Sequence, residues 1–228
     1  MNAYKDLVVA IDGASGSGKS STSRGVAQAL GLRYLDTGAQ FRAVALAVLK
    51  QGIDVDDPSA VAAFAPTPVI ASGTDPEDPT IRLDGVNVDD EIRGDAATSA
   101  VSPVAAVPGV RERLLQMQRA IIGEGGIVVE GRDIGSVVAP DADLKIYLSA
   151  DPSARAERRA LEAGGDLETT AASLLRRDTI DSSRAAAPLV VPQGAIHIDS
   201  THETLEQVIA RIVALAHEVE AARSSSHG

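Results

Sequence analysis

A glycine-rich octapeptide directly after an apolar run sets the strongest limit on how this chain can fold. Residues 7–11 have the length and composition of a buried β-strand, and residues 13–20 read GASGSGKS. This segment fits the pattern GxxxxGK(S/T), whose glycines allow a tight turn that brings several backbone N–H groups onto one anion. The helix that follows points its positive end at the same anion. The sequence therefore predicts a strand, a phosphate-binding loop and a helix, in that order.

The residue types in this loop match the chemistry of a bound nucleotide. The pattern predicts that Lys19 reaches the β and γ phosphates and that the Ser20 hydroxyl ligates Mg²⁺. The predicted ATP contacts are Gly13, Ala14, Ser15, Gly16, Ser17, Gly18, Lys19, Ser20 and Ser21. The alternative is a glycine-rich turn that only joins a strand to a helix, and the strand–loop–helix context makes it the weaker interpretation.

Strand and helix patterns alternate along the rest of the chain. Apolar runs predict strands at residues 7–11, 33–35, 127–130, 144–148 and 195–199. Helical patterns fall at residues 20–30, 40–50, 152–163, 167–179 and 202–223. This alternation predicts an α/β fold in which a parallel sheet is flanked by helices, with ligands at the carboxyl ends of the strands.

One region interrupts the alternation. Residues 65–102 contain four prolines near their start or middle, followed by residues 80–88, which read TIRLDGVNV. The alternating apolar residues around Asp84 and Gly85 predict a β-hairpin. We interpret this region as an insertion into the α/β core.

Composition narrows the class of ligand. The net charge of −11 argues against a nucleic-acid polymer, because binding to a phosphate backbone normally needs a basic face. Lysine occurs at four positions, so 17 of the 21 cationic residues are arginine. Arginine grips phosphate through two parallel N–H donors, which favours a small polyanion in a cleft. A genome of high GC content would raise the arginine count in the same way, so the positions of the arginines must decide. We assign Arg24, Arg82, Arg93 and Arg211 to solvent-facing surfaces.

Composition also bounds the setting of the protein. The absence of cysteine excludes disulfides and thiolate metal sites. The start of the chain lacks a basic segment, and its apolar run is too short for a signal peptide or a membrane span. We therefore expect a cytoplasmic protein without a membrane partner, and the acidic surface favours a monomer.

Four further motifs lie near the predicted ends of strands and helices. They are LDTGAQFR at residues 35–42, SPVAAVPGVR at 102–111, GRDIGSVVAPDADLKIYL at 131–148 and RRDTIDSSRAAAPL at 176–189. Together with IDGASGSGKS at residues 11–20, and in the same order, they resemble the bacterial cytidylate kinase family over residues 7 to about 215. Phe41 stands where this family often has tyrosine, and Glu130 where aspartate is common.

The resemblance implies an architecture and an activity. The fold would be that of a P-loop nucleoside monophosphate kinase, with a five-stranded parallel sheet in a core of residues 1–64, 103–155 and 176–228. Residues 65–102 would form an inserted acceptor-binding domain and residues 156–175 a lid. The implied reaction, part of pyrimidine nucleotide metabolism, transfers the γ-phosphoryl group of ATP to CMP or dCMP with Mg²⁺ as cofactor.

The resemblance also implies roles for single residues. Three arginines would clamp the acceptor phosphate, namely Arg42, Arg132 and Arg177. Three side chains would recognise cytosine, namely Ser102, Arg111 and Asp133. The other acceptor contacts would be Thr37, Asp181 and Arg184, of which the last two would meet the sugar. The residues expected to act in catalysis are Lys19, the three clamp arginines, and Arg155 and Arg158 of a mobile lid that also carries Arg159.

The chemistry of the residues agrees with this reaction. A phosphate monoester is largely dianionic at neutral pH, so the acceptor needs no general base, and cationic side chains must offset the repulsion between the two phosphates. The four histidines all lie in the last 32 residues, away from every motif.

Three alternatives share the phosphate-binding loop. A regulatory GTPase would need a guanine-reading (N/T)KxD segment, which this sequence lacks. Another small-molecule kinase of the same fold, such as one for shikimate, would not require the insertion. A non-catalytic nucleotide-binding module is the third alternative.

Overall fold

A five-stranded, fully parallel sheet forms the centre of the protein. The computed structural model describes residues 4–163, 166–183 and 187–226. The strand order is β2-β6-β1-β7-β8, so the first strand lies in the middle. The strands are β1 (Val8–Gly13), β2 (Arg33–Asp36), β6 (Ile127–Gly131), β7 (Leu144–Ser149) and β8 (Ile196–Asp199). All five predicted strands are confirmed, with ends that differ by at most two residues.

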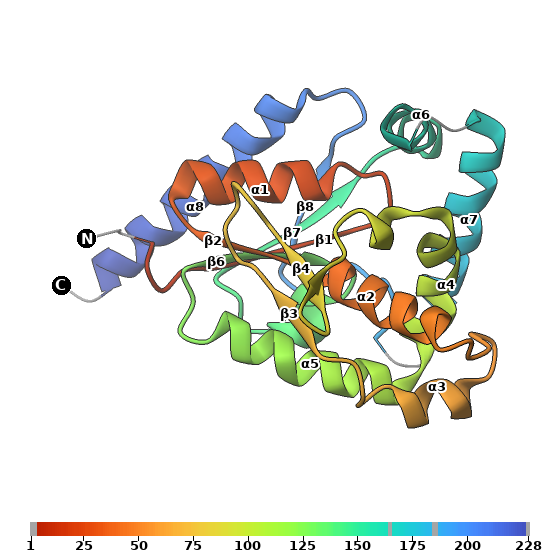
Figure 1. Ribbon diagram of the computed structural model, residues 1–228. Helices are drawn as coiled ribbons and strands as arrows, with labels where there is room; N and C mark the ends of the chain where they lie inside the picture. The colour runs from red at the N-terminus through yellow and green to blue at the C-terminus, as the bar shows by residue number, and fades with distance from the viewer. Residues whose placement is uncertain (1–3, 164–165, 184–186, 227–228) are drawn as a thin grey trace.

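Helices cover both faces of this sheet (Figure 1). On one face lie α1 (Lys19–Leu30) and α8 (Leu205–Ser226), and on the other α2 (Thr37–Lys50) and α5 (Pro108–Ile122). Successive side chains of a strand point to opposite faces. Ile11 accordingly packs into the cluster under α1 and α8, whereas Ala10 packs with Ile122 of α5. β1 and β6 are mostly apolar because both of their faces are buried. In β7 the buried apolar residues alternate with half-buried ones.

The inserted unit (residues 65–102) is built around a second, antiparallel sheet. Its strands are β3 (Ile70–Ser72), β4 (Ile81–Leu83) and β5 (Val86–Asn87), followed by a 3₁₀ turn, η1 (Glu91–Arg93). The hairpin prediction is confirmed: Asp84 and Gly85 both have positive φ, 51° and 84°, as a type I′ turn requires. The expected boundary at residue 102 falls inside α4 (Asp95–Ala106), which packs against α2.

The inserted unit is tied to the core by polar contacts as well as by the chain itself. Arg24 of α1 donates from Nε to the carbonyl oxygen of Pro76 at 3.1 Å, and Gln28 donates to the same oxygen at 3.4 Å. The backbone N–H of Tyr34 in β2 donates to the carbonyl oxygen of Thr74 at 2.8 Å. The helix that starts at the phosphate-binding loop therefore also supports the inserted unit.

Two further helices, α6 (Pro152–Ala163) and α7 (Leu167–Ser183), pack against each other beside the sheet (Figure 1). Both were predicted, but α7 continues four residues beyond its predicted end, so that Asp181 lies on the helix and is buried. A short helix, α3 (Pro58–Phe64), precedes the inserted unit. Within the ranges that the structure describes, none of the helices has the length and apolar character needed to cross a bilayer.

Candidate active site

The phosphate-binding loop joins β1 to α1 and is packed too tightly for side chains at its glycines. A Cβ atom on Gly13 would lie 2.3 Å from the carbonyl oxygen of Leu148. Gly16 has a φ of +77°, and a Cβ there would lie 2.8 Å from the carbonyl oxygen of Arg155. Lys19 donates from Nζ to the carbonyl oxygen of Ala14 at 3.3 Å. Burial lowers the pKa of Lys19, and the positive charge of Arg132 lowers it further.

Glu130, at the end of β6, fixes the hydroxyl of Ser20. Ser20 donates from Oγ to one carboxylate oxygen of Glu130 at 3.0 Å, and the buried Tyr34 hydroxyl donates to the other. Burial raises the pKa of Glu130, and the negative charge of Asp36 raises it further, while Lys19 opposes this shift. The sequence contained no signal for Tyr34, whose role depends on the parallel pairing of β2 with β6.

A cavity of about 120 Å³ opens beside the loop and contains every predicted acceptor residue that the structure describes. Its lining includes Thr37, Arg42, Ser102, Arg111, Arg132, Asp133, Arg177 and Asp181. Lys19 and Ser20 of the loop form part of the same wall. The remaining predicted acceptor residue, Arg184, lies outside the described residues. The fold thus brings together side chains that are up to 144 positions apart, Thr37 and Asp181 among them.

Acidic and basic side chains in this cavity pair with each other. Arg132 forms an ion pair from Nε to Asp181 at 2.9 Å and donates from Nη1 to the carbonyl oxygen of Gly13 at 2.9 Å. Arg111 pairs with Asp133 at 2.5 Å, and its guanidinium carbon lies 5.1 Å from the centre of the Phe41 ring. The phenylalanine therefore supports Arg111 through a cation–π contact, which needs no hydroxyl group.

Two other arginines of the cavity are short of negative partners. Arg42 donates to the hydroxyl of Thr98 at 3.0 Å, and Arg177 donates to the hydroxyl of Ser15 at 3.2 Å. The Nε of Arg177 finds no hydrogen-bond partner among the described residues. Burial lowers the pKa of Arg177 to about 9, and the charges of Arg42 and Arg132 contribute to this shift. Arg42 and Arg177 are buried cations that donate to hydroxyl groups, and such cations favour the binding of an anion between them.

Two arginines of α6 lie against the phosphate-binding loop in different ways. Arg155 pairs with Asp178 at 2.5 Å and donates to the carbonyl oxygen of Ser15 at 3.2 Å. Arg158 donates to the carbonyl oxygen of Ser200 at 2.6 Å, and the Ser200 hydroxyl in turn contacts the carbonyl oxygen of Ser17 at 3.2 Å. No sequence motif marks Ser200, which links α6 to the loop only through the fold.

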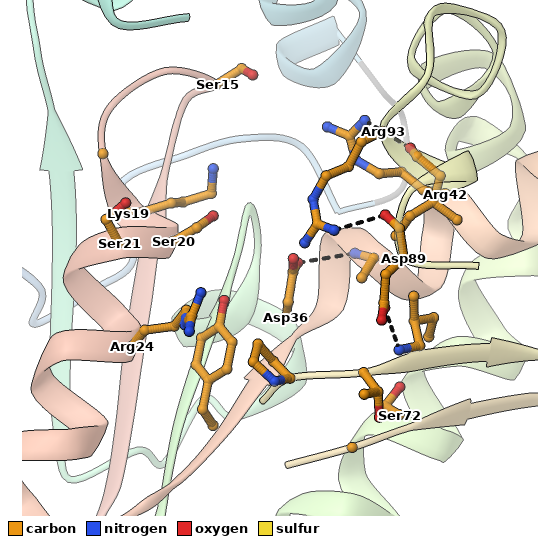
Figure 2. Close-up of a pocket in the computed structure, with 18 of the residues that line it drawn as sticks. Ser15, Lys19, Ser20, Ser21, Arg24, Asp36, Arg42, Ser72, Asp89 and Arg93 are labelled. Atoms are coloured by element: carbon orange, nitrogen blue, oxygen red, sulfur yellow. Dashed lines mark hydrogen bonds between the residues drawn. The ribbon is translucent and has the colours of Figure 1, made fainter. Parts of the chain in front are cut away.

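A larger cavity of about 230 Å³ shares the loop with the first one and extends toward the inserted unit. Figure 2 shows Lys19, Ser20 and Arg24 along one side, with Arg42, Asp89 and Arg93 facing them and Asp36 between. Arg159 of the lid also lines this cavity. The surface assignment of Arg24 is wrong, because the inserted unit folds back over α1 and half-buries it. Arg93 is exposed as expected, yet it lines the mouth of the cavity.

Comparison with known proteins identifies the family. The family model for cytidylate kinase matches residues 9–218. The chain belongs to the cytidylate kinase family. It is 53% identical over 220 residues to a cytidylate kinase from Streptomyces avermitilis, covering 95% of each chain. A cytidylate kinase from Rhodococcus opacus is 48% identical over 218 residues, which cover 93% of this chain and 95% of that one.

The family membership shows that the chain is a kinase and sets aside the regulatory GTPase and the non-catalytic module. At the level of fold alone, the chain is similar to the crystal structure of an uncharacterized protein from Eubacterium ventriosum. That likeness has a TM-score of 0.52 at 12% identity and covers 94% of this chain and 99% of the other. The predicted P-loop kinase fold is confirmed.

Proposed function

We propose that the protein transfers the γ-phosphoryl group of ATP to CMP or dCMP, giving ADP and CDP or dCDP. The observation that carries this proposal is the smaller cavity. It gathers eight predicted acceptor residues from α2, α4, α5, α7 and the segment after β6, and it shares Lys19 and Ser20 with the phosphate-binding loop. Donor and acceptor phosphates would therefore meet at one wall.

The chemistry of the transfer needs position and charge. An oxygen of the acceptor phosphate forms a bond to the γ-phosphorus of ATP, and the bond from that phosphorus to the β–γ bridging oxygen breaks, leaving ADP with the electron pair. Arg42, Arg132 and Arg177 hold the acceptor phosphate and offset its repulsion from the donor. The incoming phosphate replaces the Ser15 hydroxyl at Arg177 and competes with Asp181 for Arg132.

The base would be read by the pair of Arg111 and Asp133 together with Ser102. Arg111 binds Oδ2 of Asp133, which leaves Oδ1 to accept a hydrogen bond from the amino group of cytosine. Uracil presents a carbonyl oxygen at that position and would leave the carboxylate unpaired, at a cost of about 1 to 3 kcal/mol. We therefore expect CMP and dCMP to be preferred over UMP.

Ser20 and Glu130 fit a magnesium ion bound together with ATP. Among the described residues, no group of three or more acidic or histidine side chains is arranged to hold a metal ion. Mg²⁺ needs no such group, because substrate phosphates and water molecules fill most of its coordination shell. One or two oxygen atoms from the protein then suffice. Ser20 would supply one oxygen, with Glu130 orienting it. When bound, the ion neutralises charge on the β and γ phosphates.

The proposal also assigns segments of the chain to an acceptor-binding unit, a lid and a core. The inserted unit would close over the acceptor, residues 156–175 would act as the lid, and the rest would form the core. Arg158 of this segment donates to the carbonyl oxygen of Ser200, whose hydroxyl contacts the phosphate-binding loop at Ser17, and this link supports the lid assignment. We further propose that the protein acts as a monomer in the cytoplasm, which its high net charge favours.

A coupled assay for ADP tests this function. The purified protein is mixed with ATP and Mg²⁺ and then with CMP, dCMP, UMP, AMP or shikimate. We expect ADP release with CMP and dCMP, much less with UMP, and none above background with AMP or shikimate. Faster release with shikimate or AMP than with CMP would refute the proposal and favour another small-molecule kinase.

A further inference from the structure

Asp12 is a buried carboxylate to which the proposed reaction gives no role. It lies at the end of β1, immediately before the phosphate-binding loop, and is fully shielded from solvent. One of its oxygens accepts a hydrogen bond from the backbone N–H of Ile134 at 2.6 Å, and the other accepts from the N–H of Gly135 at 2.8 Å. Ile134 and Gly135, which carry these N–H groups, directly follow Arg132 and Asp133 in the sequence.

The segment that donates these hydrogen bonds is irregular. Residues Ile134–Val138 form a single π-helical turn (η2), in which the N–H groups of Val137 and Val138 both bond to the carbonyl oxygen of Asp133. The first N–H groups of a helical turn have no partner within it. Asp12 supplies that partner to two of them. A Cβ atom on Gly135 would lie 3.3 Å from Asp12 and 3.1 Å from Pro192, so the turn is pressed closely against the carboxylate.

Gly13, the next residue of β1, holds the side chain of Arg132. The carbonyl oxygen of Gly13 accepts a hydrogen bond from Arg132 at 2.9 Å. Adjacent residues of β1 therefore fix the guanidinium of Arg132 and the backbone that follows Asp133. We propose that Asp12 is a positioning residue for acceptor recognition, which holds the turn that presents Arg132 and Asp133. This inference rests on the proposed reading of cytosine by Asp133.

The charge of Asp12 makes this role sensitive to pH. Burial raises the pKa of Asp12 to about 6, against the effect of the two N–H donors, and the charges of Asp133 and Lys19 act in opposite directions. Tyr147 of β7 pairs in register with Asp12. Below about pH 6 the carboxyl group binds a proton, and one of the two N–H groups loses its acceptor.

The test compares kcat/KM for CMP and for UMP at pH 7.5 and pH 5.5. The two substrates carry the same phosphate group, so their ratio cancels the titration of the substrate. We expect the CMP/UMP ratio to fall about tenfold in Asp12→Asn, because the uncharged amide offers one acceptor oxygen to the two N–H groups. In the unmodified protein the ratio should fall between pH 7.5 and pH 5.5, and in Asp12→Asn it should not change with pH.

Asp143→Asn is the matched control. Asp143 accepts a hydrogen bond from the N–H of Val8 at 2.8 Å, at the opposite end of the same strand, and its variant should keep the ratio. A ratio within twofold of the unmodified protein in Asp12→Asn, with only the melting temperature lowered, overturns the proposal. If Asp12→Asn does not fold, a constant ratio between the two pH values in the unmodified protein also overturns it.

The variant Asp133→Asn distinguishes a failure of the Asp12 proposal from a failure of the proposed recognition of cytosine by Asp133. A reduced ratio in Asp133→Asn, together with an unchanged ratio in Asp12→Asn, rejects the role of Asp12 alone. Unchanged ratios in both variants reject the reading of cytosine by Asp133 as well.

Discussion

Removing the guanidinium of Arg132 should reduce both stability and catalysis, and the two losses can be separated. Arg132 forms an ion pair with Asp181 at 2.9 Å, and the two side chains are only 14% and 5% exposed. Arg132→Ala removes this ion-pair partner from the buried Asp181 carboxylate, which also accepts a hydrogen bond from the Ser102 hydroxyl at 3.4 Å. Breaking a buried ion pair in this way costs about 3 to 5 kcal/mol of unfolding free energy.

A second substitution removes part of that penalty. In Arg132→Ala/Asp181→Asn both charges of this ion pair are gone, so we expect part of the lost stability to return. Catalysis should not return. The loss of one preorganised donor from a transition state lowers kcat by about 100- to 1000-fold, and the neutral asparagine supplies no positive charge.

Chemical denaturation measures the stability of the three proteins, and the ADP assay at saturating CMP measures kcat. Near-normal turnover in Arg132→Ala would remove this residue from the phosphate clamp. Recovery of kcat in the double variant would show that the single variant had failed through misfolding, and the electrostatic reasoning would then be refuted.

Three other changes test separate parts of the molecule. Asp133→Asn should lower the CMP/UMP ratio of kcat/KM by roughly 5- to 150-fold, which corresponds to about 1 to 3 kcal/mol for a mispaired buried group; an unchanged ratio would contradict the reading of cytosine. Gly85→Ala should cost about 1 to 2 kcal/mol of unfolding free energy because φ is 84° there, and it should leave kcat unchanged because a Cβ would meet no atom within 4 Å; equal denaturation midpoints would show that the turn is not strained. Burial raises the pKa of Asp12 from 3.8 to about 6, so the folded protein binds this proton more tightly than the unfolded chain does. Its contribution should therefore lower the unfolding free energy by up to about 3 kcal/mol as the pH rises from 4 to 6, and the same titration of Asp12→Asn should lack that decrease.

The sequence predicted the central sheet because β1 and β6, which are buried on both faces, contain short apolar runs, and because buried apolar residues recur at every second position of β7. It did not predict α4, since Pro103 lies inside that helix and its small residues carry a weak periodic signal. Packing of α4 against α2 decides its conformation. α5 was not predicted either, although Pro108 in its first turn is a residue typical of a helix start.

In the candidate site, too, local patterns of residues could be predicted from the sequence, whereas contacts set by tertiary packing could not. Motifs located the loop and the arginines because each is a local pattern of residue types. The positions of Tyr34, Arg24 and Ser200 depend on which strands pair and on where the inserted unit docks. No local pattern encodes such contacts, because they join segments that are distant in the sequence.

The wall common to the two cavities has a consequence for inhibitor chemistry. The two chambers adjoin along a common set of lining residues, namely Ser15, Lys19, Ser20, Asp36 and Arg42. A single compound with two anionic arms on a short tether would reach both chambers at once. Binding of the first arm would hold the second at an effective concentration in the millimolar range. Arms aimed at Arg24 in one chamber and at Arg111 in the other would test how much affinity such a bridge gains.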